Sequence, residues 1–545
     1  DAGGGILSEY DREELERADA KLSPTARETM YQQKFHLYRN LTKPSERLYL
    51  SFAKAGASGE AQNPSYLINE IRKLFPEIPV RDIEKKEQPE ERLEMPRSGE
   101  ALFLEELGKA AEGEIDPLFE ELYRWYAAHP EAGIPAETYR KAAFLRCADG
   151  VIGRSAASAL YGDTLKNSAT RLEKYAACAF AHFMEFGLQI RERDQYELKA
   201  ADMGTVMHEA LEKFSKKLQE NGETWKTVTD DTRDRLIEEC VEETMADYGN
   251  TIFQSSSRNQ YRIIRVKRIL KRTVWALQQQ IRQGEFEPGE FEVSFSMEDS
   301  LSAINIDLSE HEKMRLRGRI DRVDLCETDD KVYVKIIDYK TGNTSLDLVA
   351  LYYGLQLQLA VYLDAAVELE QKKHPGKQVE PAGVFYYHID DPMLDQEEDE
   401  TDEAWGRRML KALRMDGLVN ADRKVVELLD RVLEDGTTSD VIPVGKKKDG
   451  SYTSYSKVAS PEQFDVIRTY TRKKVREIGE GIFSGNVKIS PYQRDGATAC
   501  AYCEYQGICG FDQKIQGYEY RKLKGMDTEL LMKAMQEITQ SDQKE

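Results

Sequence analysis

The stretch from Arg315 to Gly342, RLRGRIDRVDLCETDDKVYVKIIDYKTG, predicts two β-strands joined by a short polar turn. Side chains alternate between the two faces of a strand, so every second residue lies on the same face. In the second strand, one such face is formed by Val332, Val334, Ile336, Asp338 and Lys340. An acid and an amine are therefore expected at the end of a face that is otherwise apolar and buried.

A second acid, Asp321, lies in the first strand, where a hairpin partner can bring it near Asp338. Two carboxylates and a lysine that converge at a sheet edge can hold a divalent cation through oxygen atoms, with an ammonium group beside it. The alternative is an exposed hairpin whose charged side chains are solvated or paired with each other. The combination of GRIDRVD and DYKTG across one hairpin resembles the PD-(D/E)XK nuclease superfamily, and within it the RecB-type branch. This resemblance implies an α/β fold in which helices flank a mixed central sheet.

Length and composition indicate a globular protein of several domains. The chain has 545 residues, enough for about two to four domains, and its 40% hydrophobic content can supply sizeable cores. It contains no run of about 18 apolar residues, so no transmembrane helix is predicted. It begins DAGGGILSEYD, without an initiator Met or the apolar core of a signal peptide. We therefore expect a fragment of a longer, cytoplasmic protein.

Charge is distributed unevenly along the chain. The net charge of −21 alone argues against nucleic-acid binding. A basic segment nevertheless lies in a predicted helix at about 258–283, whereas acid is concentrated from Asp390 to Glu403. The basic helix is either a solvated surface or a track for DNA phosphates, which gives affinity without sequence preference. Under the second interpretation, the DNA-binding side chains are Arg258, Arg262, Arg265, Arg268 and Arg272.

The first part of the chain is predicted to be an α/β unit over residues 1–80, with a strand at Ser45–Ala53 and a helix that begins near Pro64. The sequence YRNLTKPSERLYLSFAKAGASGE resembles the last motor-like segment of AddB-type subunits of helicase–nucleases, which implies a partial superfamily 1 helicase-like segment. An ordinary α/β domain is the alternative. No G-x-x-x-x-G-K-[ST] motif is present, so we assign no ATP site to this chain. Residues 81–165, charged and broken by prolines, are predicted to form a helical connector.

The nuclease-like part is predicted over residues 166–515, before a helical tail at 516–545. Ser168 is expected to cap a helix that holds Arg171 to Phe186. A further helix at about 202–219 carries His208, and its sequence GTVMHEALE matches the RecB-type motif whose histidine binds the metal. A histidine on such a helix can also be purely structural. A neutral imidazole suits Mn²⁺ better than Mg²⁺, so manganese is expected to substitute for magnesium.

A helix predicted at about 346–370 places Gln358 and Tyr362 on one face, because residues four apart lie together. A packed amphipathic helix would show the same spacing. RecB-type nucleases have a Q-x-x-x-Y motif after D-x-K, and the resemblance implies that both side chains lie near the scissile phosphate or its strand.

Cysteine spacing predicts a metal site. Seven cysteines in a chain of this length do not suggest a secreted disulfide scaffold. Cys500, Cys503 and Cys509 follow a C-x2-C-x5-C spacing, and Cys178 is the candidate fourth ligand. Thiolates suit both zinc and iron–sulfur clusters, so spacing alone does not choose between them. The resemblance to AddB-type nucleases implies a [4Fe–4S] cluster with a structural role. The remaining cysteines are interpreted as core residues: Cys147, Cys240 and Cys326.

Together these residues predict metal-dependent hydrolysis of DNA. The predicted ligands of Mg²⁺ or Mn²⁺ are His208, Asp321, Asp338 and the carbonyl group of Tyr339. Lys340 is predicted to orient the attacking water or to stabilise charge on the phosphate. The resemblance covers nearly the whole chain and implies a heterodimer with the AddA helicase–nuclease subunit, in which the AddB-type nuclease cuts the 5′-ended strand during double-strand break repair. The alternatives are a DNA-binding scaffold subunit with an inactive nuclease and a stand-alone RecB-type nuclease.

Overall fold

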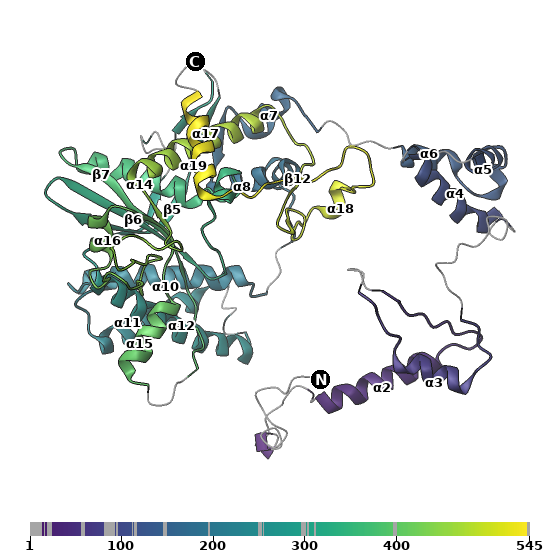
Figure 1. The fold of residues 1–545 in the computed structure, drawn as a ribbon, viewed down its shortest axis with the longest axis horizontal. Coiled ribbons are helices and arrows are strands. Elements are labelled where there is room, and N and C mark those ends of the chain that lie inside the picture. The colour runs from purple at the N-terminus through teal and green to yellow at the C-terminus, as the bar shows by residue number, and fades with distance from the viewer. Residues whose placement is uncertain are drawn as a thin grey trace. The chain divides into compact units, whose positions relative to one another are not determined.

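In the computed structural model, the chain forms two compact units, Asp1–Glu105 and Glu106–Glu545 (Figure 1). The structure describes residues 14–15, 17–18, 24, 26–55, 60–80, 93, 96–111, 113, 117–144, 150–193, 197–248, 253, 255–295, 301, 305–309, 312–395 and 400–541. The predicted division at residues 80, 165 and 515 is finer than these two units and stays a prediction.

The first unit carries the helices α2 (Ala26–Thr42) and α3 (Tyr66–Leu74). At the start of α3, the Ser65 hydroxyl accepts a hydrogen bond from the Leu67 N–H at 3.4 Å, which confirms the predicted helix. The strand predicted over Ser45–Ala53 is wrong. A strand requires a neighbouring segment for its backbone hydrogen bonds, and this segment pairs with none among the described residues.

Helices follow through the described part of the predicted connector, which confirms its helical character. They are α4 (Pro96–Ala111), α5 (Pro117–Ala128), the short 3₁₀ turn η2 (Pro130–Ala132), α6 (Ala136–Ala143) and α7 (Arg154–Tyr161). The prolines mark helix starts: α4, α5 and η2 each begin at one, and Pro135 caps α6. Proline fits the first turn of a helix, where its missing N–H costs no hydrogen bond, but it breaks a helix interior.

A six-stranded mixed sheet forms the centre of the second unit, in the order β2-β5-β6-β7-β8-β9. Its strands are β2 (Glu287–Phe295), β5 (Gly318–Glu327), β6 (Lys331–Lys340), β7 (Gln378–His388), β8 (Asp416–Asn420) and β9 (Val458–Ala459). Strands β5 and β6 form the predicted antiparallel hairpin, whereas β6 and β7 are parallel. Parallel neighbours need a crossover, and α14 (Gln358–Lys373) provides it.

Helices cover both faces of this sheet, as Figure 1 shows. One layer contains α10 (Ala200–Glu220), α11 (Asp230–Asp247) and α12 (Ser257–Gln283). The other contains α14, α8 (Ala169–Ala177), α17 (Pro461–Phe483) and α19 (Thr528–Ser541). Val332, Val334 and Ile336 are buried in the core of this second layer, which confirms the predicted strand parity. The α/β fold with a mixed central sheet flanked by helices is therefore confirmed.

Two predicted helices are interrupted. The helix predicted at about 346–370 is split into α13 (Leu348–Tyr352) and α14, with Gly354 between them at a φ of 79° that glycine adopts without strain. The helix expected through Phe186 ends at Cys178. It is followed by α9 (Ala179–His182) and the π-helical turn η3 (Phe183–Gly187). The predicted cap is confirmed, because the Ser168 hydroxyl accepts a hydrogen bond from the Arg171 N–H.

Smaller elements complete the second unit. One three-stranded sheet contains β1 (Thr164–Asn167), β4 (Lys313–Leu316) and β3 (Asn305–Asp307). Another contains β11 (Ala497–Thr498), β10 (Tyr492–Arg494) and β12 (Arg521–Lys522). The remaining helices are α15 (Asp402–Ala412), α16 (Arg423–Leu429) and α18 (Gln506–Cys509). No helix in the described part of the chain is long and apolar enough to cross a membrane.

Candidate metal centre and cysteine site

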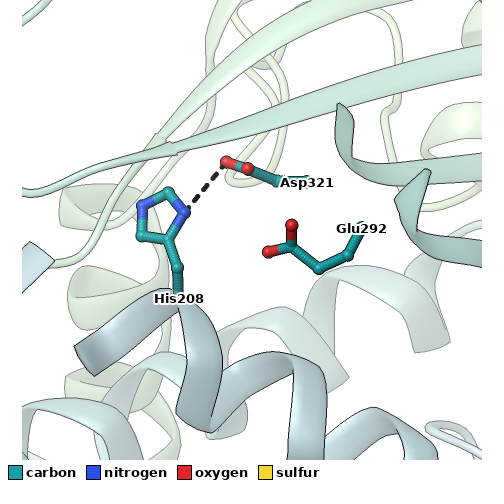
Figure 2. A group of neighbouring side chains, drawn as sticks. All are labelled: His208, Glu292 and Asp321. Carbon is teal, nitrogen blue, oxygen red and sulfur yellow. Dashed lines mark ion pairs between the residues drawn. The ribbon is translucent and has the colours of Figure 1, made fainter. Parts of the chain in front are cut away.

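A histidine and two acids from three different elements converge beside the central sheet (Figure 2). His208 lies on α10, Glu292 on β2 and Asp321 on β5, and their ligand atoms all lie within 4.8 Å of one another. His208 Nδ1 is 3.3 Å from Asp321 Oδ2. Burial lowers the pKa of His208, but the hydrogen bond and the charge of Asp321 outweigh burial and raise it. The structure thus brings together two of the predicted metal ligands.

Glu292 was missed by the sequence analysis. In the register of β2 with β5, Phe291 pairs with Arg322 and Val293 with Ile320, so Glu292 lies opposite Asp321. Its backbone has a positive φ of 51°, an uncommon conformation for a residue other than glycine. Burial and the charge of Asp321 raise the pKa of Glu292 to about 7, although Arg319 pairs with its carboxylate.

Asp338 lies next to this group, in the position predicted from the strand parity. It is almost fully buried, and its Oδ2 is 2.6 Å from the Lys340 ammonium group. The amide group of Gln358 donates a hydrogen bond to its Oδ1 at 2.8 Å. Burial and the charge of Asp321 raise the pKa of Asp338 to about 6, and Lys340 limits this rise. Asp321 and Asp338 are therefore close enough to repel each other when both are ionised.

Gln358 and Tyr362 both face Asp338 and Lys340 from α14. Lys340 Nζ donates to Gln358 Oε1 at 3.0 Å, and Gln358 Nε2 lies 3.2 Å from the Tyr362 hydroxyl. The Lys340 ammonium group also lies over the Tyr386 ring, 5.4 Å from its centre. These contacts connect Gln358 and Tyr362, the predicted Q-x-x-x-Y pair, to Asp338 and Lys340, the predicted D-x-K pair. An amphipathic helix that merely packs against the sheet would not require such contacts.

Tyr339 links the two acids through its backbone. Its N–H donates to Asp321 Oδ2 at 2.7 Å, which fixes Asp321 beside the strand that carries Asp338. Its ring lies edge-on to the His208 ring, with 5.8 Å between their centres. The Tyr339 side chain thereby supports the imidazole, a role that the sequence analysis did not anticipate.

A buried charged trio lies one layer behind the centre, on β5 and β6. The guanidinium group of Arg322 makes two hydrogen bonds to Asp324, at 2.5 and 2.8 Å, and Lys335 Nζ is 2.6 Å from the same carboxylate. Burial alone would raise the pKa of Asp324, but Arg322 and Lys335 hold it below its usual value. The trio explains the second Asp of GRIDRVD as a structural residue.

The basic helix α12 is only partly available for phosphate contacts. Arg268 is 2.7 Å and Arg272 is 3.8 Å from Asp391, an acid of the segment that follows β7. Arg272 also stacks over Trp405. The remaining predicted contacts lie in the N-terminal half of α12 and make no ion pair among the described residues: Arg258, Arg262 and Arg265.

The four predicted cysteines line one apolar cavity. Cys178 lies at the end of α8, whereas Cys500, Cys503 and Cys509 lie near the end of the chain. Burial raises the pKa of Cys500, and the other three cysteines raise it further, which requires them to be near. The rest of the lining includes Phe180, Ala181, Ile489, Pro491 and Phe511. Cys240 and Cys326 are buried core residues, as predicted, and Cys147 lies outside the described residues.

Comparison with known proteins gives consistent results. Residues 166–510 match the model of the PD-(D/E)XK nuclease superfamily. Among curated proteins, the chain is 42% identical over 535 residues to the B subunit of an ATP-dependent helicase/deoxyribonuclease from Lachnoclostridium phytofermentans, covering 97% of this chain and 45% of that protein. The subunits of the same name from Alkaliphilus metalliredigens and Clostridium tetani are 34% and 32% identical; the matches cover 98% and 99% of this chain and 47% of each relative. The chain thus spans about half the length of these relatives.

Proposed function

Because the chain belongs to the PD-(D/E)XK nuclease superfamily, we propose that it is a metal-dependent deoxyribonuclease that hydrolyses phosphodiester bonds. The predicted resemblance to AddB-type subunits is confirmed by relatives that are named as the B subunit of an ATP-dependent helicase/deoxyribonuclease. The observation that carries the proposal is the convergence of an imidazole, carboxylates and one ammonium group near the end of β6 and the start of β5.

The residues fit a divalent cation such as Mg²⁺ or Mn²⁺. Of the three carboxyl groups in this site, Asp338 pairs with Lys340 and Glu292 with Arg319, whereas Asp321 meets no lysine or arginine in the described structure and contacts His208 and the Tyr339 N–H. Such an excess of buried negative charge is costly unless a cation compensates it. We assign metal binding to His208, Asp321, Asp338 and the Tyr339 carbonyl, with Glu292 as an additional candidate. A bound divalent cation supplies Lewis acidity and lowers the pKa of its water.

The ammonium group of Lys340 is the proposed catalytic cation. It lies beside Asp338, where it can orient the attacking water or stabilise negative charge that develops on the phosphate. Gln358 holds both Lys340 and Asp338, and Tyr362 lies next to Gln358 in turn. We therefore assign Gln358 and Tyr362 to the support of the reacting groups and of the DNA strand.

The four cysteines fit a [4Fe–4S] cluster. The four thiols line one apolar cavity, which suits a thiolate-bound metal group, and the resemblance to AddB-type nucleases favours a cluster over zinc. Its role is structural: it ties α8 to the distant segment that carries Cys500, which offsets the entropy of closing a very long loop.

We further propose that the chain acts within a heterodimer with an AddA-type helicase–nuclease, in the cytoplasm, on single-stranded DNA ends that emerge from unwound duplex. The names of the relatives, which describe one subunit of a helicase/deoxyribonuclease, support this assignment. In this proposal the nuclease cuts the 5′-ended strand, in the 5′→3′ direction, during double-strand break repair. The intact pair of Asp338 and Lys340 argues against an inactive scaffold. Relatives of about twice this length argue against a stand-alone nuclease, as does the predicted motor-like character of the first segment.

The direct test is cleavage of end-labelled single-stranded DNA with and without Mg²⁺, comparing the wild type with Asp338→Asn. This change keeps the size of the side chain and removes its negative charge. We expect Mg²⁺-dependent cleavage by the wild type and none by the variant, with DNA binding retained. Equal cleavage by both proteins would refute the proposed centre. DNA binding by the wild type without any cleavage would favour the inactive scaffold.

A further inference from the structure

Glu173, in the middle of α8, fixes the start of the helix that carries Gln358. Its Oε1 accepts hydrogen bonds from the backbone N–H groups of Leu357 at 2.6 Å and Gln358 at 3.0 Å. The first N–H groups of a helix have no partner within the helix, and a carboxylate there also interacts favourably with the helix dipole. A single side chain of α8 therefore caps the start of α14.

The start of α14 is also where the nuclease centre is held together. Gln358 is the first residue of α14, and its amide group contacts Asp338 and Lys340. Glu173 itself lies near this pair: burial raises its pKa above the usual value, and the two backbone hydrogen bonds and the charge of Lys340 limit this rise. A displacement of Glu173 would therefore move the amide group on which both reacting side chains depend.

The other end of α8 belongs to the cysteine site. Cys178 is the residue at which α8 ends. Arg521, from β12, contacts the carbonyl groups of Ala176 and Ala177 at this end and donates to the Ser490 carbonyl at 3.0 Å. Arg521 thus joins the C-terminal end of α8 to the segment that precedes the last three cysteines.

Close packing leaves little room between α8 and the turn before α14. A Cβ atom placed on Gly354 would lie 3.1 Å from the Ala176 side chain, which is tighter than ordinary contact. Leu172 of α8 and Leu357 are both fully buried in the same core. Because α8 is a short helix of nine residues, a change at Cys178 reaches Glu173 through little more than one turn.

We propose that Glu173 is a positioning residue that transmits the state of the four-cysteine site to the nuclease centre. An occupied cysteine site fixes α8, Glu173 fixes the first turn of α14, and Gln358 then holds Asp338 and Lys340 in the arrangement for cleavage. The inference rests on the proposed function, and it gives the cysteine site an influence on catalysis beyond general stability.

Hydrogen–deuterium exchange tests this connection without any activity measurement. Compared with wild type, the folded single variant Cys178→Ser should show faster exchange at the backbone N–H groups of Leu357 and Gln358. In Glu173→Ala, exchange there should already be fast, and adding Cys178→Ser should change it little. Glu477→Ala, which removes a surface ion pair on α17, is the matched control and should leave these N–H groups protected. Unchanged exchange in Cys178→Ser, or an equal increment in both backgrounds, would overturn the inference.

A second comparison remains decisive if Cys178→Ser does not fold. Iron is then removed by a chelator from folded wild type and from Glu173→Ala, whose side chain cannot accept the hydrogen bonds of the Leu357 and Gln358 N–H groups. Exchange at the start of α14 should rise on iron removal in the wild type and rise less in the variant. Equal rises in both proteins, or no rise in the wild type, would refute transmission through Glu173.

Cleavage kinetics distinguish this positioning role from a purely structural one. Glu173→Ala should lower kcat on the order of tenfold with little change in KM, and it should keep its iron and visible absorption. In a Gln358→Ala background the same change should cost much less, because Glu173 acts through Gln358. Full additivity of the two losses would contradict the inference. A wild-type chain that does not cut DNA would refute the proposed function, while the exchange experiment would still decide the role of Glu173.

Discussion

Replacing Lys340 by alanine removes the ammonium group that lies 2.6 Å from Asp338 Oδ2 and donates to Gln358 Oε1 at 3.0 Å. The side chain is partly exposed at the end of β6, so its removal opens no core cavity. Loss of one preorganised group that stabilises transition-state charge costs roughly 10²–10³ in kcat, or about 2.7–4 kcal/mol. We expect a loss of this size, with DNA binding within a few-fold of wild type.

The pH dependence of the same variant gives a second quantity to measure. Burial and the charge of Asp321 raise the pKa of Asp338 to about 6, and Lys340 works in the opposite direction. Without Lys340, this pKa should rise further. Protons then compete with the cation for Asp338 up to a higher pH, so the residual activity should require more Mg²⁺ near pH 6 than wild-type activity does.

The assay is single-turnover cleavage of labelled single-stranded DNA at saturating protein, with binding followed separately by fluorescence anisotropy. Lys372→Ala is the matched control, because it removes a lysine from α14 whose side chain is 45% exposed. The control should cut at the wild-type rate. Wild-type cleavage by Lys340→Ala, or a loss of binding as large as the loss of cleavage, would refute the role assigned to Lys340.

Three further predictions concern other parts of the chain. The purified protein should be brown and contain iron, and Cys500→Ser should lose both and have a lower melting temperature. A colourless wild type with one bound zinc would contradict the cluster. The pKa of Glu292 is raised from its ordinary value of 4.5 to about 7 in the folded chain. The protonated carboxyl group therefore adds to the free energy of unfolding at low pH, and this contribution is lost as the pH rises through 7. Between pH 5 and pH 8, the melting temperature of the metal-free protein should therefore fall less steeply with rising pH in Glu292→Gln than in wild type. Equal slopes of melting temperature against pH would contradict this. Arg265→Ala should weaken single-stranded DNA binding more than Arg268→Ala, because Asp391 already pairs with Arg268, and equal losses in anisotropy titrations would contradict the assignment.

Local patterns predicted where four side chains of the candidate centre lie on their strand and helix. Alternation along β6 placed Asp338 and Lys340 at the end of an apolar face, because a strand has a fixed period of two. Helical spacing placed Gln358 and Tyr362 together, because residues four apart share a helix face. Both relations depend only on neighbouring residues. The roles of these side chains in catalysis stay predictions.

Pairing between distant segments could not be predicted in the same way. Glu292 faces Asp321 only because of the register between β2 and β5, which nothing in the local sequence specifies. Glu173 reaches the start of α14, and Asp391 reaches α12, through tertiary packing between segments far apart in the sequence. The break at Gly354 did leave a signal, since a glycine inside a helical pattern often marks its end.

The central claim is that His208, Asp321 and Asp338 share one cation. The most direct test is anomalous diffraction from crystals of this chain soaked in Mn²⁺, repeated with Asp338→Asn. We predict one strong peak within bonding distance of the His208 imidazole and of a carboxylate oxygen from both acids, weakened or lost in the variant. A fully occupied Mn²⁺ elsewhere with none at these three residues would contradict the account. So would an ion that binds His208 and Asp321 but lies beyond bonding distance of Asp338.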